Sequence, residues 1–506
     1  MPGTGLWRTK SVEQSMADTD EPGSRLRKNL SAWDLTVFGV AVVIGAGIFT
    51  LTARTAGDFA GPSVSVAFVL AAIACALAAL CYAEFASTVP VAGSAYTFSY
   101  ATFGEFVAWI IGWDLVLEFA VGAAAVSTGW SEYLQTVLTY LFGDGIKTTV
   151  EIGGLSVNWG ALLLIAVLGT LLAVGTKLSS RVSMVITGIK VVIVLFVILL
   201  GLFYIKGSNY RPFVPPASSG SSAASGVDQT LFSWLAGGSS STFGIFGLLA
   251  GASLVFFAFI GFDVVATTAE ETRNPRHAVP RGILGSLAIV TVLYVATALV
   301  VTGMVKYSDL ATDAGDGSQK TLATAFALNH VDWAANVISF GALAGLTTVV
   351  MVLMLGQVRV LFAMSRDGLL PRGLARTGEH GTPVRATILV AVLVAAAATF
   401  FPAGKLEEMV NVGTLFAFIL VSAGVMILRR THPNLERAFR VKWLAVIGPA
   451  AIIACVWLML NLTILTWLRF FVWMVIGVVV YFGYSRGHSR VGLRAREPAE
   501  SEASAS

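Results

Sequence analysis

Residues 43 to 49 read Val-Ile-Gly-Ala-Gly-Ile-Phe and fall inside an apolar block that runs from 33 to 52. A block of about 20 apolar residues is long enough to cross a membrane as a helix. Glycine inside a helix costs about 1 kcal/mol relative to alanine, so Gly45 and Gly47 together favour an unwound turn. Unwound backbone at membrane depth is tolerated only where it faces protein or a wet cavity. The stretch therefore predicts a broken membrane helix beside a binding site.

The composition of the whole chain is that of a membrane protein. Of its 506 residues, 56% are hydrophobic and 12% are charged, whereas soluble domains carry about 25% charged residues. The apolar residues gather in blocks close to or above the length of a membrane span. These blocks are 33–52, 63–88, 105–130, 159–177, 182–205, 244–268, 283–305, 334–364, 384–401, 409–428, 443–463 and 467–485. We predict an all-α integral membrane protein with 12 transmembrane helices.

The basic residues predict the orientation of these helices. With the N-terminus placed inside, about two thirds of the 33 Lys and Arg residues fall in inward loops and tails. This asymmetry predicts cytoplasmic N- and C-termini for a multi-pass protein of the plasma (inner) membrane. Residues 1–29 are polar and lack the apolar run of a signal peptide. The first span should begin at Ser31-Ala-Trp-Asp34, which has the pattern of a capping box.

A second interruption is predicted in the sixth block, at Phe256-Phe-Ala-Phe-Ile-Gly-Phe-Asp263, where Gly261 would mark the break. Breaks at matching places in two five-helix halves are typical of transporters with a binding site near the midplane. Freed N–H groups suit a carboxylate, and freed carbonyls suit an ammonium group, so an amino acid is a fitting substrate. The alternative is that these glycines only permit close helix packing.

The predicted organisation follows from the two halves. It comprises a cytoplasmic N-terminal tail (1–29), a first inverted repeat of five helices (30–205), an extracellular Ser/Gly-rich loop (206–243), a second inverted repeat of five helices (244–428), two further helices (429–485) and a cytoplasmic C-terminal tail (486–506).

Several function classes are excluded by what the sequence lacks. No phosphate-binding Gly-x-x-x-x-Gly-Lys-[Ser/Thr] loop occurs, so ATP-driven transport on this chain is not expected. The five histidines are scattered and the three cysteines lie in apolar blocks, so we expect no metal and no cofactor. No nucleophile motif lies in a suitable span, so we expect no enzyme and no catalytic residue. A net charge of +4 does not predict nucleic-acid binding.

A set of short motifs, in order along the chain, resembles the amino acid–polyamine–organocation superfamily, and within it the cationic amino acid transporter family and its bacterial members. The motifs are Gly45-Ala-Gly-Ile-Phe49, Tyr82-Ala-Glu-Phe-Ala86, Pro90-Val-Ala-Gly-Ser-Ala-Tyr96, Trp113-Asp-Leu-Val-Leu-Glu118, Phe257-Ala-Phe-Ile-Gly-Phe-Asp263, Ala269-Glu-Glu-Thr-Arg-Asn-Pro275, Gly356-Gln-Val-Arg359 and Met364-Ser-Arg-Asp-Gly-Leu-Leu-Pro371. The resemblance implies a five-plus-five inverted repeat, of the leucine-transporter type, followed by two C-terminal helices. It also implies a secondary-active permease that moves L-amino acids, cationic and/or small neutral, across the plasma membrane by alternating access.

The resemblance further implies the substrate-binding residues. The backbone of the first break and the carbonyls of the second would hold the substrate, Glu118 would lie near its side chain or ammonium group, and Leu346 would line the pocket. The implied set is Ile44, Gly45, Ala46, Gly47, Glu118, Phe257, Ile260 and Leu346. A carboxylate at Glu118 suits a cationic side chain, although it could also be protonated or bonded to neighbouring helices. A leucine such as Leu346 is more often a packing residue.

Lys190 lies within the fifth block, where a buried lysine is costly unless it is neutral, paired or wet. In some bacterial members of the resembled family, a lysine at this position takes the place of a sodium ion between helices 1 and 8. We therefore expect proton coupling through Lys190. The alternative is a lysine that extends to the cytoplasmic interface, about 12 Å of helix rise away.

A group of charged residues near the cytoplasmic ends of helices 2, 6 and 8 is a candidate inner gate, formed by Glu84, Glu270, Arg359 and Asp367. The alternative for these charges is a solvated network at the membrane surface.

Three other functions stay open at this point. They are a sodium-coupled transporter of amino acids or polyamines with the same fold, a uniporter, and a receptor that binds amino acids without transporting them. The expected partners are an L-amino acid, protons and the lipid bilayer, and the sequence leaves room for a small single-span partner subunit.

Overall fold

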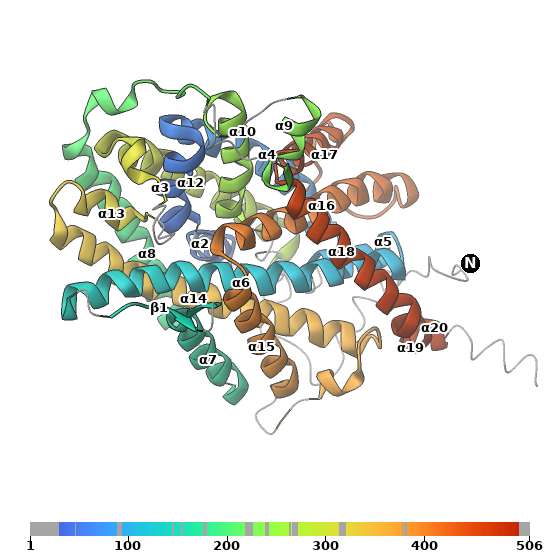
Figure 1. The fold of residues 1–506 in the computed structure, drawn as a ribbon. Coiled ribbons are helices and arrows are strands. Elements are labelled where there is room, and N and C mark those ends of the chain that lie inside the picture. The colour runs from blue at the N-terminus through green and yellow to red at the C-terminus, as the bar shows by residue number, and fades with distance from the viewer. Residues whose placement is uncertain are drawn as a thin grey trace, which may run out of the picture.

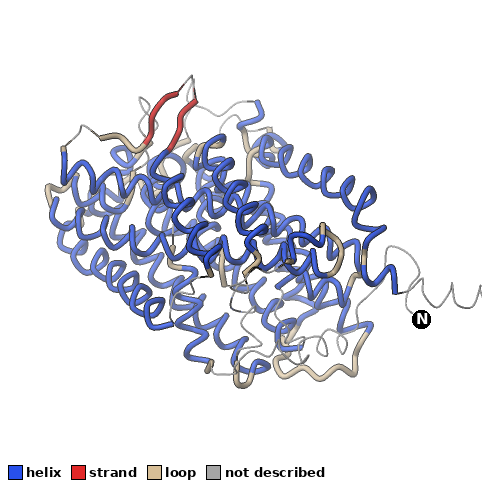
Figure 2. Tube along the Cα trace, turned by 90° about the horizontal axis from the view of Figure 1, so that it is seen from below, coloured by secondary structure: helices blue, strands red, loops and turns tan. Residues whose placement is uncertain are grey.

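The protein is almost entirely helical, apart from one short strand pair at its edge (Figures 1 and 2). The computed structural model describes residues 30–45, 47–88, 94–143, 146–152, 155–175, 180–217, 226–237, 242–262, 265, 272–312, 320–376, 378 and 382–494. The strands β1 (Thr149–Ile152) and β2 (Leu155–Asn158) form an antiparallel hairpin.

The longer helices of the first half are α2 (Ala32–Val43), α4 (Val64–Thr88), α5 (Ser94–Thr102), α6 (Glu105–Phe142), α7 (Trp159–Val174) and α8 (Ser180–Gly201). Those of the second half are α10 (Gly244–Val255), α12 (Pro275–Met304), α14 (Asp332–Arg366), α15 (Val384–Phe400), α16 (Ala403–Thr431), α17 (Leu444–Leu460) and α18 (Ile464–Val480). Short helices are α3 (Thr52–Thr55), α9 (Leu231–Leu235), α13 (Leu322–Ala327), α19 (Arg486–His488) and α20 (Arg490–Arg494). Single turns are η1 (Gly47–Leu51), η2 (Ala56–Ala60), η3 (Gly61–Ser63), η4 (Leu202–Tyr204), η5 (Gly207–Tyr210), η6 (Gly226–Asp228), η7 (Phe256–Phe259), η9 (Tyr307–Leu310), η10 (Arg372–Ala375) and η11 (Tyr481–Ser485).

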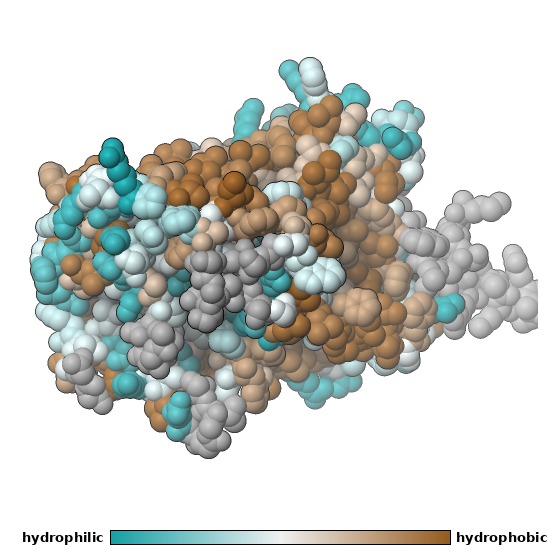
Figure 3. Space-filling view, turned by 45° about the horizontal axis from the view of Figure 1, so that its top comes forward, coloured by the Kyte–Doolittle hydropathy of each residue, from teal (hydrophilic) through white to brown (hydrophobic). Residues whose placement is uncertain are grey.

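The helices have the length and composition of membrane spans. In the described part of the chain, 7 helical stretches are long and apolar enough to cross a membrane, and five shorter apolar helices accompany them. Each of the twelve predicted blocks contains one of these helices, although the number of crossings and the inverted repeat remain predictions. Hydrophobic side chains cover a broad area of the face in Figure 3, as expected of a surface in contact with lipid.

The first predicted span begins as its sequence indicates. The hydroxyl of Ser31 accepts a hydrogen bond from the Asp34 amide at 3.3 Å, and the Asp34 carboxylate accepts one from the Ser31 amide at 2.8 Å. This confirms the capping box at the start of α2. The span then stops at Val43 and resumes at η1, so it is built from two pieces rather than one helix.

The long helix α6 is the centre of the bundle and packs against both α14 and α16 (Figure 1). Its first residue, Glu105, is buried and accepts hydrogen bonds from the hydroxyls of Tyr100, Tyr481 and Ser489. The backbone amide of Arg490 donates to the carbonyl of Asp367, just beyond α14. The start of α6 and the ends of α14 and α18 therefore meet, and we call this the tail end of the bundle; the opposite end is the far end.

The predicted Ser/Gly-rich loop contains more structure than its composition suggests. Within residues 206–243, the described segments form η5, η6 and α9. Tyr210 donates a hydrogen bond to the carbonyl of Leu299 on α12 at 2.8 Å, and Thr230 pairs with Thr463 at the start of α18. Contacts with distant helices order these segments, and composition alone does not reveal such contacts.

Candidate functional site

The first helix break lies at Ile44 and Gly45. Ile44 has φ −68° and ψ 92°, an extended conformation that ends α2. A wide turn, η1, follows from Gly47. The break therefore occurs where the two glycines predict it, and Gly45 and Gly47 line a cavity there. Ala46, between them, lies outside the described residues.

The second break lies in the predicted position as well. After η7, Ile260 is extended with ψ 138°, and Gly261 takes φ +112°. This left-handed conformation is readily adopted by glycine and rarely by other residues. A Cβ atom at Gly261 would also lie only 2.8 Å from a methyl group of Val42. The sequence needs glycine here for both reasons. Asp263 and Glu270, further along, lie outside the described residues.

The two breaks touch each other. A Cβ atom on Gly47 would lie 2.1 Å from the Cα atom of Ala258, which is much closer than two non-bonded carbon atoms can approach. The backbone of η1 therefore packs directly on that of η7, and only glycine at position 47 permits this contact. At Gly47, the close packing that the sequence offers as an alternative and the helix break therefore occur together.

Tyr294 of α12 joins the two broken helices, although no sequence pattern indicates it. Its hydroxyl is buried and lies 2.7 Å from the carbonyl of Val43 and 3.0 Å from that of Ala258. These carbonyls belong to residues that border the two breaks. Since a hydroxyl carries one hydrogen, it is shared between two acceptors. The rings of Phe68 and Phe259 pack around Tyr294, with centroids 5.6 and 5.3 Å away.

A cavity opens where the breaks meet α6, α14 and α16. Most of its lining is glycine or branched aliphatic: Val42, Val43, Gly45, Gly47, Gly122, Val126, Phe257, Ile260, Gly261, Val349, Val352, Leu353 and Val410. Among the described residues of the lining, Glu118 of α6 is the single ionisable side chain. The volume is about 40 Å³, far below the roughly 300–1,000 Å³ of ordinary ligand pockets. A ligand of the size of an amino acid would need a wider cavity than this one.

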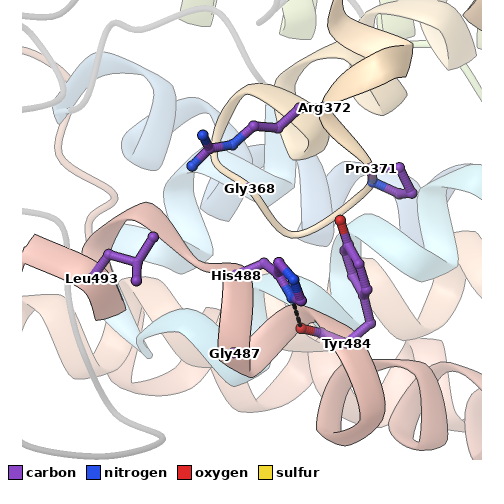
Figure 4. A pocket seen from close by; sticks show the side chains of 7 residues that line it. All are labelled: Gly368, Pro371, Arg372, Tyr484, Gly487, His488 and Leu493. Carbon is purple, nitrogen blue, oxygen red and sulfur yellow. Dashed lines mark hydrogen bonds between the residues drawn. The ribbon is translucent and has the colours of Figure 1, made fainter.

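A larger cavity, of about 400 Å³, lies at the tail end (Figure 4). It is formed by Gly368, Pro371 and Arg372 after α14 and by Tyr484 and His488 near α19. The His488 ring stacks on Tyr484, and neither helix break contributes to the lining. We therefore take the smaller cavity as the candidate substrate site, because both helix breaks line it and Glu118 is the one carboxyl among its described lining residues.

Comparison with known proteins agrees with this geometry. Residues 30–490 match the sequence family described as "Amino acid permease". The chain belongs to the amino acid permease family. This places the permease in the amino acid–polyamine–organocation superfamily. The family and the relatives that match the chain are transporters and not enzymes.

Three relatives illustrate the range of the family. The permease is 40% identical to the branched-chain amino acid permease BcaP of Bacillus subtilis, over 96% of this chain and 99% of that protein. It is 40% identical to the methylthioribose transporter of the same organism, with the same coverage. It is 36% identical to the vacuolar cationic amino acid transporter 4 of Arabidopsis thaliana, over 85% of this chain and 68% of that protein.

The predicted substrate-binding residues divide into two groups. Gly45, Gly47, Glu118, Phe257 and Ile260 line the cavity of the permease. Ile44 and Leu346 are fully buried and do not appear in the lining. The carbonyl of Phe257 accepts the amide of Ile260 at 3.2 Å and keeps a second lone pair for a ligand. The valines that α14 and α16 contribute escape sequence analysis, because valines pack in every membrane helix.

Lys190 lies between the first and eighth predicted spans. Its side chain is 2% exposed, and its amino group donates to the carbonyl of Ala41 at 3.0 Å, near the end of α2. Its methylene groups lie against Gly345 of α14, where a Cβ atom would sit 3.0 Å from Cγ. The amino group therefore points into the bundle and does not extend to a membrane surface.

The residues predicted as an inner gate have different partners. Glu84 is buried and accepts two hydrogen bonds from Arg429 at the end of α16, at 2.7 and 2.5 Å, with Arg437 at 3.8 Å. Asp367 accepts a hydrogen bond from Tyr96 at 2.8 Å. Arg359 is exposed on α14, and Glu270 lies outside the described residues. Glu84 and Asp367 thus hold separate parts of the tail end.

The far end holds an ion pair that sequence reasoning missed. Arg54 of α3 is mostly buried and pairs with Glu407 at the start of α16. Asp58 lies 3.8 Å from the same guanidinium. The pair joins the first broken helix to α16 on the other side of the cavity from the tail end.

Proposed function

We propose that this permease carries L-amino acids by secondary-active transport, with alternating access to the cavity between the two breaks. The observation that carries the proposal is the meeting of the breaks at one cavity, in which Glu118 is the one carboxyl among the described lining residues. Freed N–H groups there can hold a substrate carboxylate, and freed carbonyls can hold the ammonium group. Opening at one end and then the other would require the contacts at Arg54 and at Glu84 to change in turn.

The lining supports an L-amino acid with an aliphatic side chain as the first substrate class. Branched methyl groups surround the cavity from α6, α14 and α16. A relative with 40% identity is named a branched-chain amino acid permease. The second class is cationic, because Glu118 could pair with a basic side chain and other relatives are named cationic amino acid transporters.

Lys190 supports proton coupling as the driving force. A lysine amino group between α2 and α14, bonded to the end of a broken helix, occupies space that a coupling ion would need. A group that gains or loses a proton there would change the contact with α2 and so link protonation to movement. Sodium coupling and uniport are the alternatives, and a receptor without transport is a weaker one.

We place the permease in the plasma membrane with its tail end in the cytoplasm. The basic residues of the loops support this orientation, since cytoplasmic loops carry an excess of Lys and Arg. The bilayer is its immediate partner, and a small single-span subunit could pack on its lipid-facing surface.

Uptake into proteoliposomes tests the proposal. Labelled L-leucine and L-arginine would be supplied in sodium-free buffer, with and without an inward proton gradient. Wild type would be compared with Lys190→Met, which keeps the length of the side chain, and with Lys147→Met, a change at an exposed lysine. We expect leucine accumulation that needs the gradient in wild type and in the Lys147 variant, and no response to the gradient without Lys190.

The outcomes separate the parts of the proposal. Gradient-driven uptake of arginine alone would reverse the substrate assignment. A requirement for sodium, or an unchanged response without Lys190, would remove proton coupling through this lysine and leave the permease itself intact. Binding of leucine without any uptake would favour a receptor.

A further inference from the structure

Asp114 is a buried carboxyl group that the substrate site does not use. It lies on α6, one helical turn before Glu118, and is 0% exposed. Among the residues that the structure describes, none donates a hydrogen bond to either of its oxygens. The carboxyl rests on the backbone of α16, where a Cβ atom on Gly413 would lie 2.7 Å from Oδ1. A glycine at 413 therefore makes the room that the acid occupies.

The position of Asp114 is on the tail-end side of the cavity. On α6, four residues separate it from Glu118, which corresponds to about 6 Å of helix rise toward Glu105. On α16, its neighbour Gly413 comes three residues after Val410, which lines the cavity, or about 4.5 Å further toward the tail end. Both helices place the carboxyl between the substrate site and the proposed cytoplasmic surface.

The charged groups on the surrounding helices are engaged elsewhere or face away. Glu118, on the same helix, is the nearest ionisable group along the chain. On α16, Glu407 pairs with Arg54, Glu408 accepts hydrogen bonds from Thr463 and Thr466, and Arg429 pairs with Glu84. On α14, Arg359 is exposed, and on α18, Arg469 lies over the ring of Phe401. On α5, Tyr96 donates a hydrogen bond to Asp367 and Tyr100 donates one to Glu105. No cation in the described part of the chain balances a charge on Asp114.

Burial and the lack of a partner determine the protonation state. An ionised carboxylate without a donor or a cation is very costly in a dry interior, so the group is held as the neutral acid while the bundle is closed. Once water reaches a carboxyl group, it ionises at neutral pH. A movement that lets water reach the Asp114 carboxyl group therefore releases a proton, and a movement that excludes the water binds one.

We propose that Asp114 is a proton-binding site of the transport cycle, which releases its proton to the cytoplasm when the tail end opens. This inference rests on the proposed proton-coupled transport. In the closed, loaded state the O–H bond of the acid is intact, so substrate and proton cross together. When the tail end opens and the amino acid leaves, water accepts the proton and the carboxylate remains. The emptied cavity keeps the carboxylate hydrated until it is protonated again from the other side.

The variant Asp114→Asn tests this step, since an amide has nearly the shape of the neutral acid and cannot release a proton. Exchange of internal for external leucine needs only the loaded form, so we expect exchange within about threefold of wild type. Gradient-driven accumulation, and acidification of a pH dye inside the vesicles, should fall at least about tenfold because the proton no longer leaves with the substrate. Glu105→Gln is the matched control, a buried acid on the same helix whose three donors fix it in place; it should keep the response to the gradient.

Accumulation and dye signal at wild-type levels in Asp114→Asn would overturn the inference, because the acid would then be a permanently neutral packing group. If the variant loses exchange as well, infrared difference spectra of wild type decide: a protonated-carboxyl band that changes with leucine and is absent from the variant supports the inference, and an unchanging band overturns it. Wild type that ignores the proton gradient altogether would instead refute the proposed coupling, which is a distinguishable failure.

Discussion

The change Tyr294→Phe removes one oxygen atom from the place where the two broken helices meet. The aromatic ring and its contacts with Phe68 and Phe259 remain. The carbonyls of Val43 and Ala258 lose their shared donor, which lies 2.7 and 3.0 Å away in the native permease. Because both breaks supply backbone to the cavity, we expect the loss to affect both stability and substrate binding.

The magnitude follows from the hydrogen bond. A net contribution of about 0.5–1.5 kcal/mol rises to about 1–3 kcal/mol when a buried acceptor is left unsatisfied. If this free energy is lost from the conformation that binds substrate, the apparent substrate affinity falls by about 5- to 150-fold. The maximal rate should fall less than the affinity, since the hydroxyl positions the binding backbone and does not contact the membrane or the solvent.

Uptake of leucine over a range of concentrations in proteoliposomes measures this split, with thermal unfolding of the purified variant beside it. The control is Tyr210→Phe, which removes a hydroxyl that donates at 2.8 Å to the carbonyl of Leu299 on α12, and neither residue lines the cavity. Equal effects of the two changes on affinity, or wild-type affinity in Tyr294→Phe, would refute the positioning role.

Three further changes test other contacts. Gly47→Ala would place a methyl carbon 2.1 Å from the Cα atom of Ala258, so we expect leucine uptake near background and a lower melting temperature; normal uptake would contradict the described contact of the breaks. Arg54→Gln leaves Glu407 buried without its partner and should cost about 3–5 kcal/mol, measured by thermal unfolding, with partial recovery when Glu407→Gln is added. Glu118→Gln should reduce arginine transport much more than leucine transport in competition assays, and equal loss would show that the carboxyl does not select between them.

The sequence predicts the membrane class from its long apolar blocks, and it predicts both helix breaks because glycines interrupt the apolar blocks at matching places in the two halves. Gly45, Gly47 and Gly261 all lie at the unwound backbone. The start of α2 is predicted equally well, since a capping box is a contact between residues three positions apart. Local rules of this kind can be read directly from residue order.

The sequence does not predict which distant residues pair. Tyr294 is an ordinary aromatic residue of an apolar helix until residues 43 and 258 are brought beside it. From charge alone, Glu84 is grouped with the other acids and bases at the tail end. The packing of α4 against α16 instead brings it into an ion pair with Arg429. The valines that line the cavity cannot be predicted for the same reason. Whether a given valine faces the cavity depends on how the two broken helices pack against α6, α14 and α16.

The three hydrogen bonds that Glu105 accepts have a consequence for the order in which the protein is synthesised and assembled. Two of its three hydroxyl donors, Tyr481 and Ser489, follow it by 376 and 384 positions. At a synthesis rate of about 5–20 residues per second, Glu105 waits roughly 20 to 75 seconds before those donors leave the ribosome. Until then, Tyr100 is the one donor of these three that has already been made. Assembly of this face is therefore completed only once the last helices have been made, and a chain truncated before residue 481 would lack two of the three donors to Glu105.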